Sequence, residues 1–316
     1  MNSSKQKTND RVKQLMDEVN RRGAERYSSI YNDISALPPE LKSSKLNQLV
    51  NNDEIKVIVY FPPQIHRGWQ YVPKQALIFM KDKVVHSLAS IWPESEPQIN
   101  SINNDDLMYI EITLILLYGS LKIEAINQDS ISIIEVEFNT VSWHHLSRPI
   151  YRMLHSKYID NQPTQKQERQ SNIALKQKEL SVKFTNGIQI YGLLPNETLY
   201  WVIFQPEYWK QWFFFLRKQL IANTMILRTT NYLIIMKEEL NIGHGWIIAY
   251  IPWNNIRNIN QRQKGTWQEI EIIIEYNEKT DGYKLLTSNE IAKEWRNDWI
   301  QFGGQWIAGE DEGIAK

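Results

Sequence analysis

Few residues in this sequence could do chemistry, and the histidines are the first group to consider. Six histidines are spread over 316 residues, and only His144 and His145 are adjacent. Neighbouring residues on a helix point about 100° apart, so we do not expect these two imidazoles to share a metal ion from one face. The chain has no HExxH pattern and no cysteine. The sequence therefore predicts no metal site, and one packed and one solvated histidine at a helix entrance.

Paired carboxylates could act as a general acid and base, and two groups have suitable spacing. One is Asp105 and Asp106 with Glu111, and the other is Glu135 with Glu137. In IIEVEF the two glutamates alternate with apolar residues, which is the pattern of any half-exposed strand. The chain also contains no GxSxG motif and no P-loop. We therefore expect no enzyme, no cofactor and no small-molecule substrate.

The most distinctive segment is FQPEYWKQWFFFLRK, residues 204–218, with seven aromatic residues in fifteen positions and a basic end. On a helix, Tyr208, Trp212 and Phe215 would line one side. The segment could be an interfacial membrane anchor, because aromatic residues with basic flanks favour the head-group region. It could also be an aromatic patch for a protein partner, or a helix or strand buried between two domains. The candidate binding residues are Tyr208, Trp209, Trp212, Phe213, Arg217 and Lys218.

The charge and composition of the chain limit the classes of partner that it could bind. Lys plus Arg and Asp plus Glu number 36 each, so the formal net charge is zero. A neutral chain has no long-range field to gather nucleic acid, and we expect none to bind, although interleaved aromatic and basic residues could suit a single strand. The polar N-terminus has no signal-peptide pattern, and the longest apolar run, residues 112–118, is far shorter than the ~20 residues of a membrane span. The expected location is the cytoplasm.

Five regions follow one another along the chain. Residues 1–53 read as a helical extension. The first 35 or so form one helix, whose narrow apolar face of Val12, Leu15, Met16 and Val19 either docks on something or leaves the helix to fray, and residues 39–52 form a short helix. Residues 54–159 alternate with a period of about two over six strands and end in a helix near residues 140–158. A Gln- and Lys-rich linker covers residues 160–180. A second β unit covers residues 181–306, and residues 307–316 form a flexible tail.

The second unit begins with the expected strands LSVKF and IQIYGLL. Residues 229–259 then predict a β-hairpin, in which Tyr232, Ile234 and Met236 share one face of a strand and glycines supply the turn. The closing helix, residues 288–302, has Ser288 as its cap and a stripe formed by Trp295 and Trp299. Both indoles should be buried.

The order of elements and two motifs give this chain a resemblance to a known family. MILRTTNYLII, residues 225–235, and YIPWNNI, residues 250–256, resemble the central hairpin and following strand of bacterial pleckstrin-homology-like (PH-like) proteins. The resemblance implies bent, seven-stranded antiparallel barrels or sandwiches, each capped by a C-terminal helix. We therefore expect a mainly β, α+β fold with two tandem PH-like units. The basic phosphoinositide signature of eukaryotic members has no residue-by-residue match here, so the resemblance does not imply lipid binding.

These inferences predict a non-enzymatic binding or scaffold protein that acts through protein–protein contacts or self-association. The alternative is a peripheral membrane protein that uses the aromatic-basic segment 204–218.

Overall fold

The computed structural model describes residues 2–22, 27–66, 70–127, 130–154, 180–195, 197–213, 216–240, 245–276, 279–301 and 303–308. The chain divides into two compact units. The first comprises residues 1–107 and 114–159, and the second comprises residues 108–113 and 160–316. A strand segment that lies early in the sequence, Met108–Thr113, thus belongs to the second unit. The expected linker lies outside the described residues except for Leu180.

The N-terminal region is more divided than the sequence pattern predicts. Helix α1 (Asn2–Arg22) ends well before residue 35, and strand β1 (Ser29–Tyr31) follows it, so the prediction of one long helix is wrong. Gly23 follows Arg22 directly, and glycine disfavours helix continuation. Residues 39–54 form α2 (Ser44–Leu49) between two 3₁₀ turns. Helix α2 starts where the Ser43 hydroxyl accepts a hydrogen bond from the Leu46 amide at 3.1 Å.

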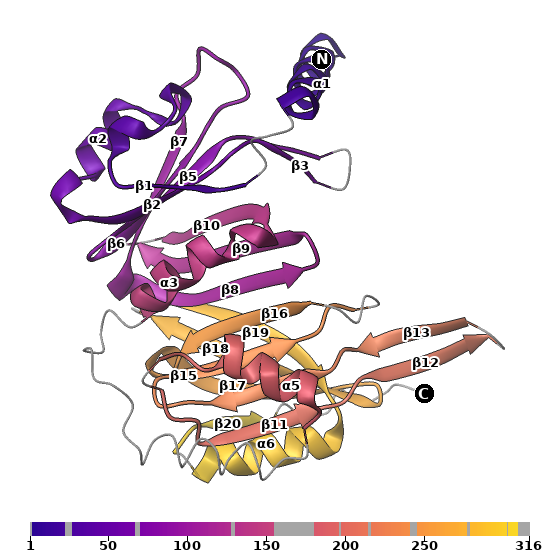
Figure 1. The fold of residues 1–316 in the computed structure, drawn as a ribbon. Helices are drawn as coiled ribbons and strands as arrows, with labels where there is room; N and C mark the ends of the chain where they lie inside the picture. Colours follow the sequence, from indigo (N-terminus) through magenta and orange to yellow (C-terminus); the bar gives the residue numbers. More distant parts are fainter. Residues whose placement is uncertain are drawn as a thin grey trace. The chain divides into compact units, whose positions relative to one another are not determined.

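The first unit contains an antiparallel sheet in the order β1-β2-β5-β6-β7 (Figure 1). Its long strands are β2 (Ile55–Phe61), β5 (Gln75–Met80), β6 (Lys83–Leu88) and β7 (Gln98–Asn103). A small hairpin, β3 (Gln64–His66) and β4 (Gln70–Val72), lies between β2 and β5. The core on one side of this sheet joins Ile58 and Ile78 to Leu41 and Leu46 from the helical region. That contact explains why the extension folds against the sheet.

Three further strands and a helix follow along the chain, and the central residues of the first of these strands belong to the second unit. These elements are β8 (Leu107–Ile115), β9 (Tyr118–Asn127), β10 (Ser130–Asn139) and α3 (Trp143–Leu154). In β10 the apolar residues Ile134, Val136 and Phe138 are fully buried, as the alternation predicts. Phe138 packs against Phe61 with ring centroids 6.1 Å apart. Helix α3 buries the expected face through Leu146, Ile150 and Leu154.

The second unit repeats this order. Its first meander joins β11 (Trp201–Gln205), β14 (Thr224–Arg228), β15 (Tyr232–Lys237) and β16 (Trp246–Pro252), with the central residues of β8 beside β16. The predicted hairpin is confirmed, because Tyr232 pairs with Pro252 and Met236 with Ile248. Its expected turn lies largely outside the described residues. Strands β17 (Ile256–Lys264), β18 (Trp267–Tyr276) and β19 (Lys279–Thr287) follow, then α6 (Asn289–Gln301) and β20 (Trp306–Ala308).

The start of the second unit departs from the sequence prediction. Residues expected to form two strands instead form α5 (Val182–Gly187) and a turn of π-helix (Ile188–Gly192). Phe184 and Ile188, four residues apart, are buried together, so the helical spacing determines the structure here. Phe184 packs on Trp246, with ring centroids 5.6 Å apart. Ile307 and Ala308, expected in a loose tail, lie in β20.

The mainly β, α+β class is confirmed. Every long-stranded sheet among the described residues is open rather than closed into a barrel. One order of elements occurs twice along the chain: four strands with a small hairpin between the first and the second, then three strands and a helix. The sheets themselves do not follow this division, because β8, β9 and β10 lie in one seven-stranded sheet with β16, β15, β14 and β11. In the described part of the chain, no helix has the length and apolar character needed to cross a bilayer.

Candidate functional site

The aromatic-basic segment forms a two-stranded hairpin, so of the helix and the strand that the sequence left open it adopts the strand. Strand β12 (Tyr208–Phe213) pairs with β13 (Leu216–Ile221) in antiparallel register. Aromatic residues favour strands, and the close succession of Trp and Phe gives no polar helix face. Figure 1 shows the hairpin extending from the second unit as an arm. It lies between the first and second strands of that unit's meander.

The base of this hairpin is held by a chain of polar contacts. The buried Gln219 amide donates to the Glu207 carboxylate at 3.0 Å, and the Glu207 amide donates to the Asn223 side-chain oxygen at 2.9 Å. Asn223 in turn donates to Glu238 at 2.6 Å, and Lys183 forms an ion pair with the same buried carboxylate. Because buried polar groups are costly when unpaired, this network fixes where the hairpin leaves the sheet.

Two aromatic residues on the hairpin are half-exposed. Tyr208 and Trp209 are each 42% exposed, and Lys210, Gln211 and Lys218 are exposed. Tyr208 rests against Trp267, with ring centroids 4.5 Å apart. Since the Tyr208 and Trp209 side chains retain this exposure, the interpretation of the segment as a buried strand is not supported for them. Such a combination of aromatic and cationic groups suits a binding surface.

The register of the hairpin places two positive charges together. Lys210 lies directly opposite Lys218 across the two strands. Like charges at directly opposed positions destabilise a strand pair. No ion pair joins either ammonium group to a carboxylate within the described ranges. An acidic partner would therefore relieve a repulsion that the free hairpin carries.

The structure describes the side chains of three of the six candidate residues. Tyr208, Trp209 and Lys218 are all exposed on the hairpin, with Trp209 opposite Gln219 on one face and Lys218 opposite Lys210 on the other. Trp212, Phe213 and Arg217 lie in the same two strands, and their side chains lie outside the described part of the structure. Lys210 was not among the candidates, and the period of two along the strand is the signal that could have found it.

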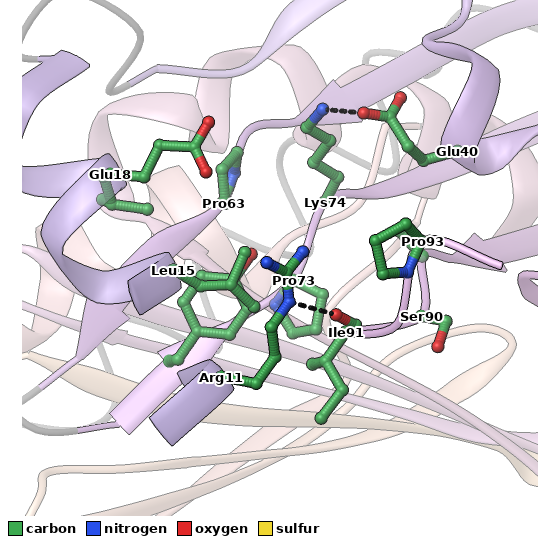
Figure 2. Close-up of a pocket in the computed structure, with 13 residues that line it drawn as sticks. Arg11, Leu15, Glu18, Glu40, Pro63, Pro73, Lys74, Ser90, Ile91 and Pro93 are labelled. Carbon is green, nitrogen blue, oxygen red and sulfur yellow. Dashed lines mark hydrogen bonds and ion pairs between the residues drawn. The ribbon is translucent and has the colours of Figure 1, made fainter. Parts of the chain in front are cut away.

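A cavity of about 240 Å³ in the first unit is a second candidate (Figure 2). Helix α1 forms one wall through Leu15 and Val19, which belong to the apolar face that the sequence predicts to dock. Figure 2 shows the Arg11 Nε donating to the Ile91 carbonyl at 3.0 Å, which ties α1 to the loop after β6. The remaining wall contains three prolines, Pro63, Pro73 and Pro93.

The charges around this cavity offset one another. Arg11 and Lys74 contribute two cations, and Glu18 and Glu40 contribute two carboxylates. Lys74 and Glu40 form an ion pair at 2.5 Å. The volume is also below the roughly 300–1,000 Å³ of ordinary small-molecule sites. The cavity therefore has no net charge and little space for a ligand. We interpret it as the place where α1 packs against the first unit rather than as a ligand site.

The two adjacent histidines lie close together. The ring centroids of His144 and His145 are 3.8 Å apart, and His144 is exposed whereas His145 is half-buried. The His144 Nδ1 forms a hydrogen bond with the Val141 carbonyl, three residues earlier in the chain, at 2.5 Å. The His145 Nδ1 lies 2.7 Å from the Ser28 hydroxyl. Burial, with the neighbouring His144, lowers the pKa of His145. No group of three side chains suited to a metal occurs among the described residues.

The carboxylates considered for catalysis are engaged separately. Asp106 accepts from the Asn103 amide at 2.8 Å in the first unit, whereas Glu111 accepts from the Tyr283 hydroxyl at 3.1 Å in the second. Glu135 is exposed on β10, and Glu137 accepts from the Tyr118 hydroxyl at 3.2 Å. These contacts are those of surface strands and turns, and they assemble no acid–base pair in a cleft.

Comparison with known proteins gives no family assignment: no protein-family model and no curated protein matches the chain.

Proposed function

We propose that the protein is a non-enzymatic binding or scaffold module built from two tandem PH-like units and working in the cytoplasm. Its support is the order of elements, which occurs twice along the chain and ends each time in an amphipathic helix. Further support comes from the motifs at residues 225–235 and 250–256, which occupy β14 to β15 and the end of β16 with the following turn. Fold alone does not define function, so the binding role depends on the site.

The observation that carries the binding role is the anchored hairpin β12–β13, which exposes Tyr208 and Trp209 and places Lys210 opposite Lys218 with no carboxylate partner among the described residues. Tyr and Trp dominate the energetics of protein interfaces, because they bury large areas at low entropic cost. Lys210 and Lys218 add a preference for carboxylates. The partner that this surface fits is a protein, or a second copy of the chain, with acidic residues around an apolar patch.

A membrane surface is the second candidate, and a specific feature of the hairpin favours it. Between the basic residues, β12 ends and β13 begins with the sequence WFFFL, residues 212–216. An apolar aromatic run with basic flanks matches what anionic head-groups attract. The same residues therefore allow a lipid surface in place of a protein.

Cross-linking from the hairpin tests the protein-binding role. A photo-cross-linking amino acid at Gln211, on the same strand face as Trp209, should form an adduct with a protein in cells. Adding Trp209→Ala should remove that adduct, because loss of a central tryptophan typically costs about 2 kcal/mol, roughly 30-fold in Kd. The free energy of unfolding should change by no more than about 0.5 kcal/mol, as expected for a surface substitution. The readouts are adduct yield and urea denaturation.

A matched control places the cross-linker at Ile131, which is 43% exposed on β10 of the first unit. That position should give no adduct that depends on Trp209. Co-sedimentation with anionic vesicles that is lost in Trp209→Ala, without a protein adduct, would establish the membrane alternative instead. If neither adduct nor co-sedimentation depends on Trp209, the hairpin is not the binding surface.

A further inference from the structure

A different part of the second unit is closed by the chain's own C-terminal end. Strand β17 has nine residues, and one of its sides is paired with β18 along most of its length. On the other side, within the described residues, only Ile259, Asn260 and Gln261 have partners, and these partners are the three residues of β20. Figure 1 labels β20 next to β17 and α6. An edge strand with free backbone groups is a template for pairing with an additional strand.

Strand β20 is held by a small number of directed contacts. The Gln305 carbonyl accepts from the Ile259 amide at 3.1 Å and from the Trp299 indole at 3.0 Å. The Trp306 indole donates to the Gln261 side chain at 2.9 Å. Its ring meets that of Trp295 edge-on, with centroids 5.8 Å apart. The edge therefore recognises an extended backbone and one tryptophan.

Several features make β20 removable. It pairs through three residues, and Ile307 at its centre is 50% exposed. The chain reaches it through Gly303 and Gly304, and Gly303 has a positive φ of 78° that glycine adopts readily. Short, exposed segments with few buried apolar contacts open at low free-energy cost.

Beside the start of β20 there is room for more than the chain's own segment. An open cavity of about 470 Å³ is lined by Trp253, Arg257, Trp299 and the residues Gly303–Gln305. The rings of Trp253 and Trp299 lie 4.6 Å apart at this cavity. A longer peptide could pair with more of β17 and fill this space, and it would thereby bury more surface than β20 does.

We propose that β20 is a displaceable cover, and that the β17 edge beside α6 binds an extended peptide segment of a partner protein that inserts a tryptophan in the place of Trp306. Backbone hydrogen bonds to β17 supply the affinity. The Trp295 ring and the Gln261 side chain, which now contact Trp306, select a tryptophan in the partner segment. The cover keeps this edge closed to other strands until the partner segment competes for it. This site is separate from hairpin β12–β13 and extends beyond the function proposed above.

A reversible lock on the cover tests the proposal in the full chain. Asn260→Cys and Ile307→Cys substitute two directly paired, accessible residues, and the chain has no other cysteine. Paired residues of neighbouring strands lie about 4.8 Å apart, within the range that a disulfide spans. The probe is a fluorescent synthetic peptide with the sequence of residues 303–308, followed by anisotropy. The oxidised protein should bind it at least tenfold more weakly than the same protein after reduction.

Opening the cover provides the second arm. Trp306→Ala removes the contacts to Trp295 and Gln261, so this variant should bind the peptide at least tenfold more tightly than the unaltered chain. A peptide with alanine in place of tryptophan should bind neither protein. Equal affinity in the oxidised and reduced states overturns the proposal, and so does a lack of binding by every open form that keeps its far-UV circular dichroism. Because the cysteine pair leaves Trp306 in place, the test does not depend on Trp306→Ala folding.

Discussion

Trp295→Ala is expected to lower the free energy of unfolding of the second unit by about 3–5 kcal/mol, the usual cost of truncating a buried tryptophan. Trp295 is fully buried on α6, which packs against β11 and β18. Small domains have only about 5–15 kcal/mol of stability, so this loss removes a large part of the stability of the second unit and favours its aggregation. Urea denaturation followed by circular dichroism measures the effect.

Two control variants of α6 separate packing from other causes. Arg296 is exposed on the opposite side, so Arg296→Ala should change the free energy of unfolding by at most about 0.5 kcal/mol. Trp295→Phe keeps most of the ring and removes the buried Nε1–H, which has no hydrogen-bond acceptor among the described residues. Its cost should therefore be clearly smaller than that of alanine. If Trp295→Ala retains normal stability and loses only a binding partner, α6 is a recognition surface.

The closing helix and the central hairpin were predictable because their signals are local. The Ser288 hydroxyl accepts from the Ile291 amide at 3.3 Å, which is the predicted helix start. Trp295 and Trp299 lie four residues apart and are both buried, as the stripe requires. In β15 and β16 the alternation is long enough to define two strands and their pairing. In each case a few neighbouring residues contain the whole pattern.

The errors arise where distant contacts decide between similar local patterns. IQIYG alternates like a strand, yet it forms a helical turn because Phe184 and Ile188 pack inward with Trp246 nearby. MYIEIT, residues 108–113, is correctly a strand, but nothing local indicates that it belongs with β16 in the second unit. Strand β20 has three residues, which is too short for any period to be visible.

The candidate site shows the same division. Composition alone identified the aromatic-basic segment, and the structure places it on a hairpin rather than a helix. The repulsive pairing of Lys210 with Lys218 depends on the register of the two strands, which includes a bulge near Tyr208. Exposure of Trp209 depends on which strands surround the hairpin base. Neither property could be read from residues 204–218 by themselves.

Acidification is expected to weaken the first unit through one buried histidine. His86 is 3% exposed in β6, and burial lowers its pKa from 6.5 to about 4. Its Nε2 lies 3.3 Å from the Gln75 side-chain oxygen, and the Gln75 amide donates to the Glu137 carbonyl at 3.0 Å. The Gln75 side chain therefore has its oxygen toward the ring, and the neutral imidazole donates a hydrogen bond to it. Neither Gln75 nor the Glu137 carbonyl has a negative charge that would stabilise a protonated imidazole.

The sign of the pH effect follows from this lowered pKa. Above pH 6.5 His86 is neutral in both states, so its contribution to stability is unchanged there. As the pH falls from 6.5 to about 4, the unfolded chain binds the proton first, and stability is lost over this window. At pH 5 the loss is about 2 kcal/mol, and below pH 4 it approaches about 3 kcal/mol.

Replacing the titrating ring isolates this contribution. His86→Gln keeps an amide N–H that can donate to Gln75 and cannot be protonated in this range. We expect urea denaturation to show about 2 kcal/mol less loss of unfolding free energy between pH 7.5 and 5 for this variant than for the unaltered chain. Identical pH profiles for His86→Gln and the unaltered chain would mean that the folded state accepts the proton at His86 without cost, which its burial beside Gln75 opposes.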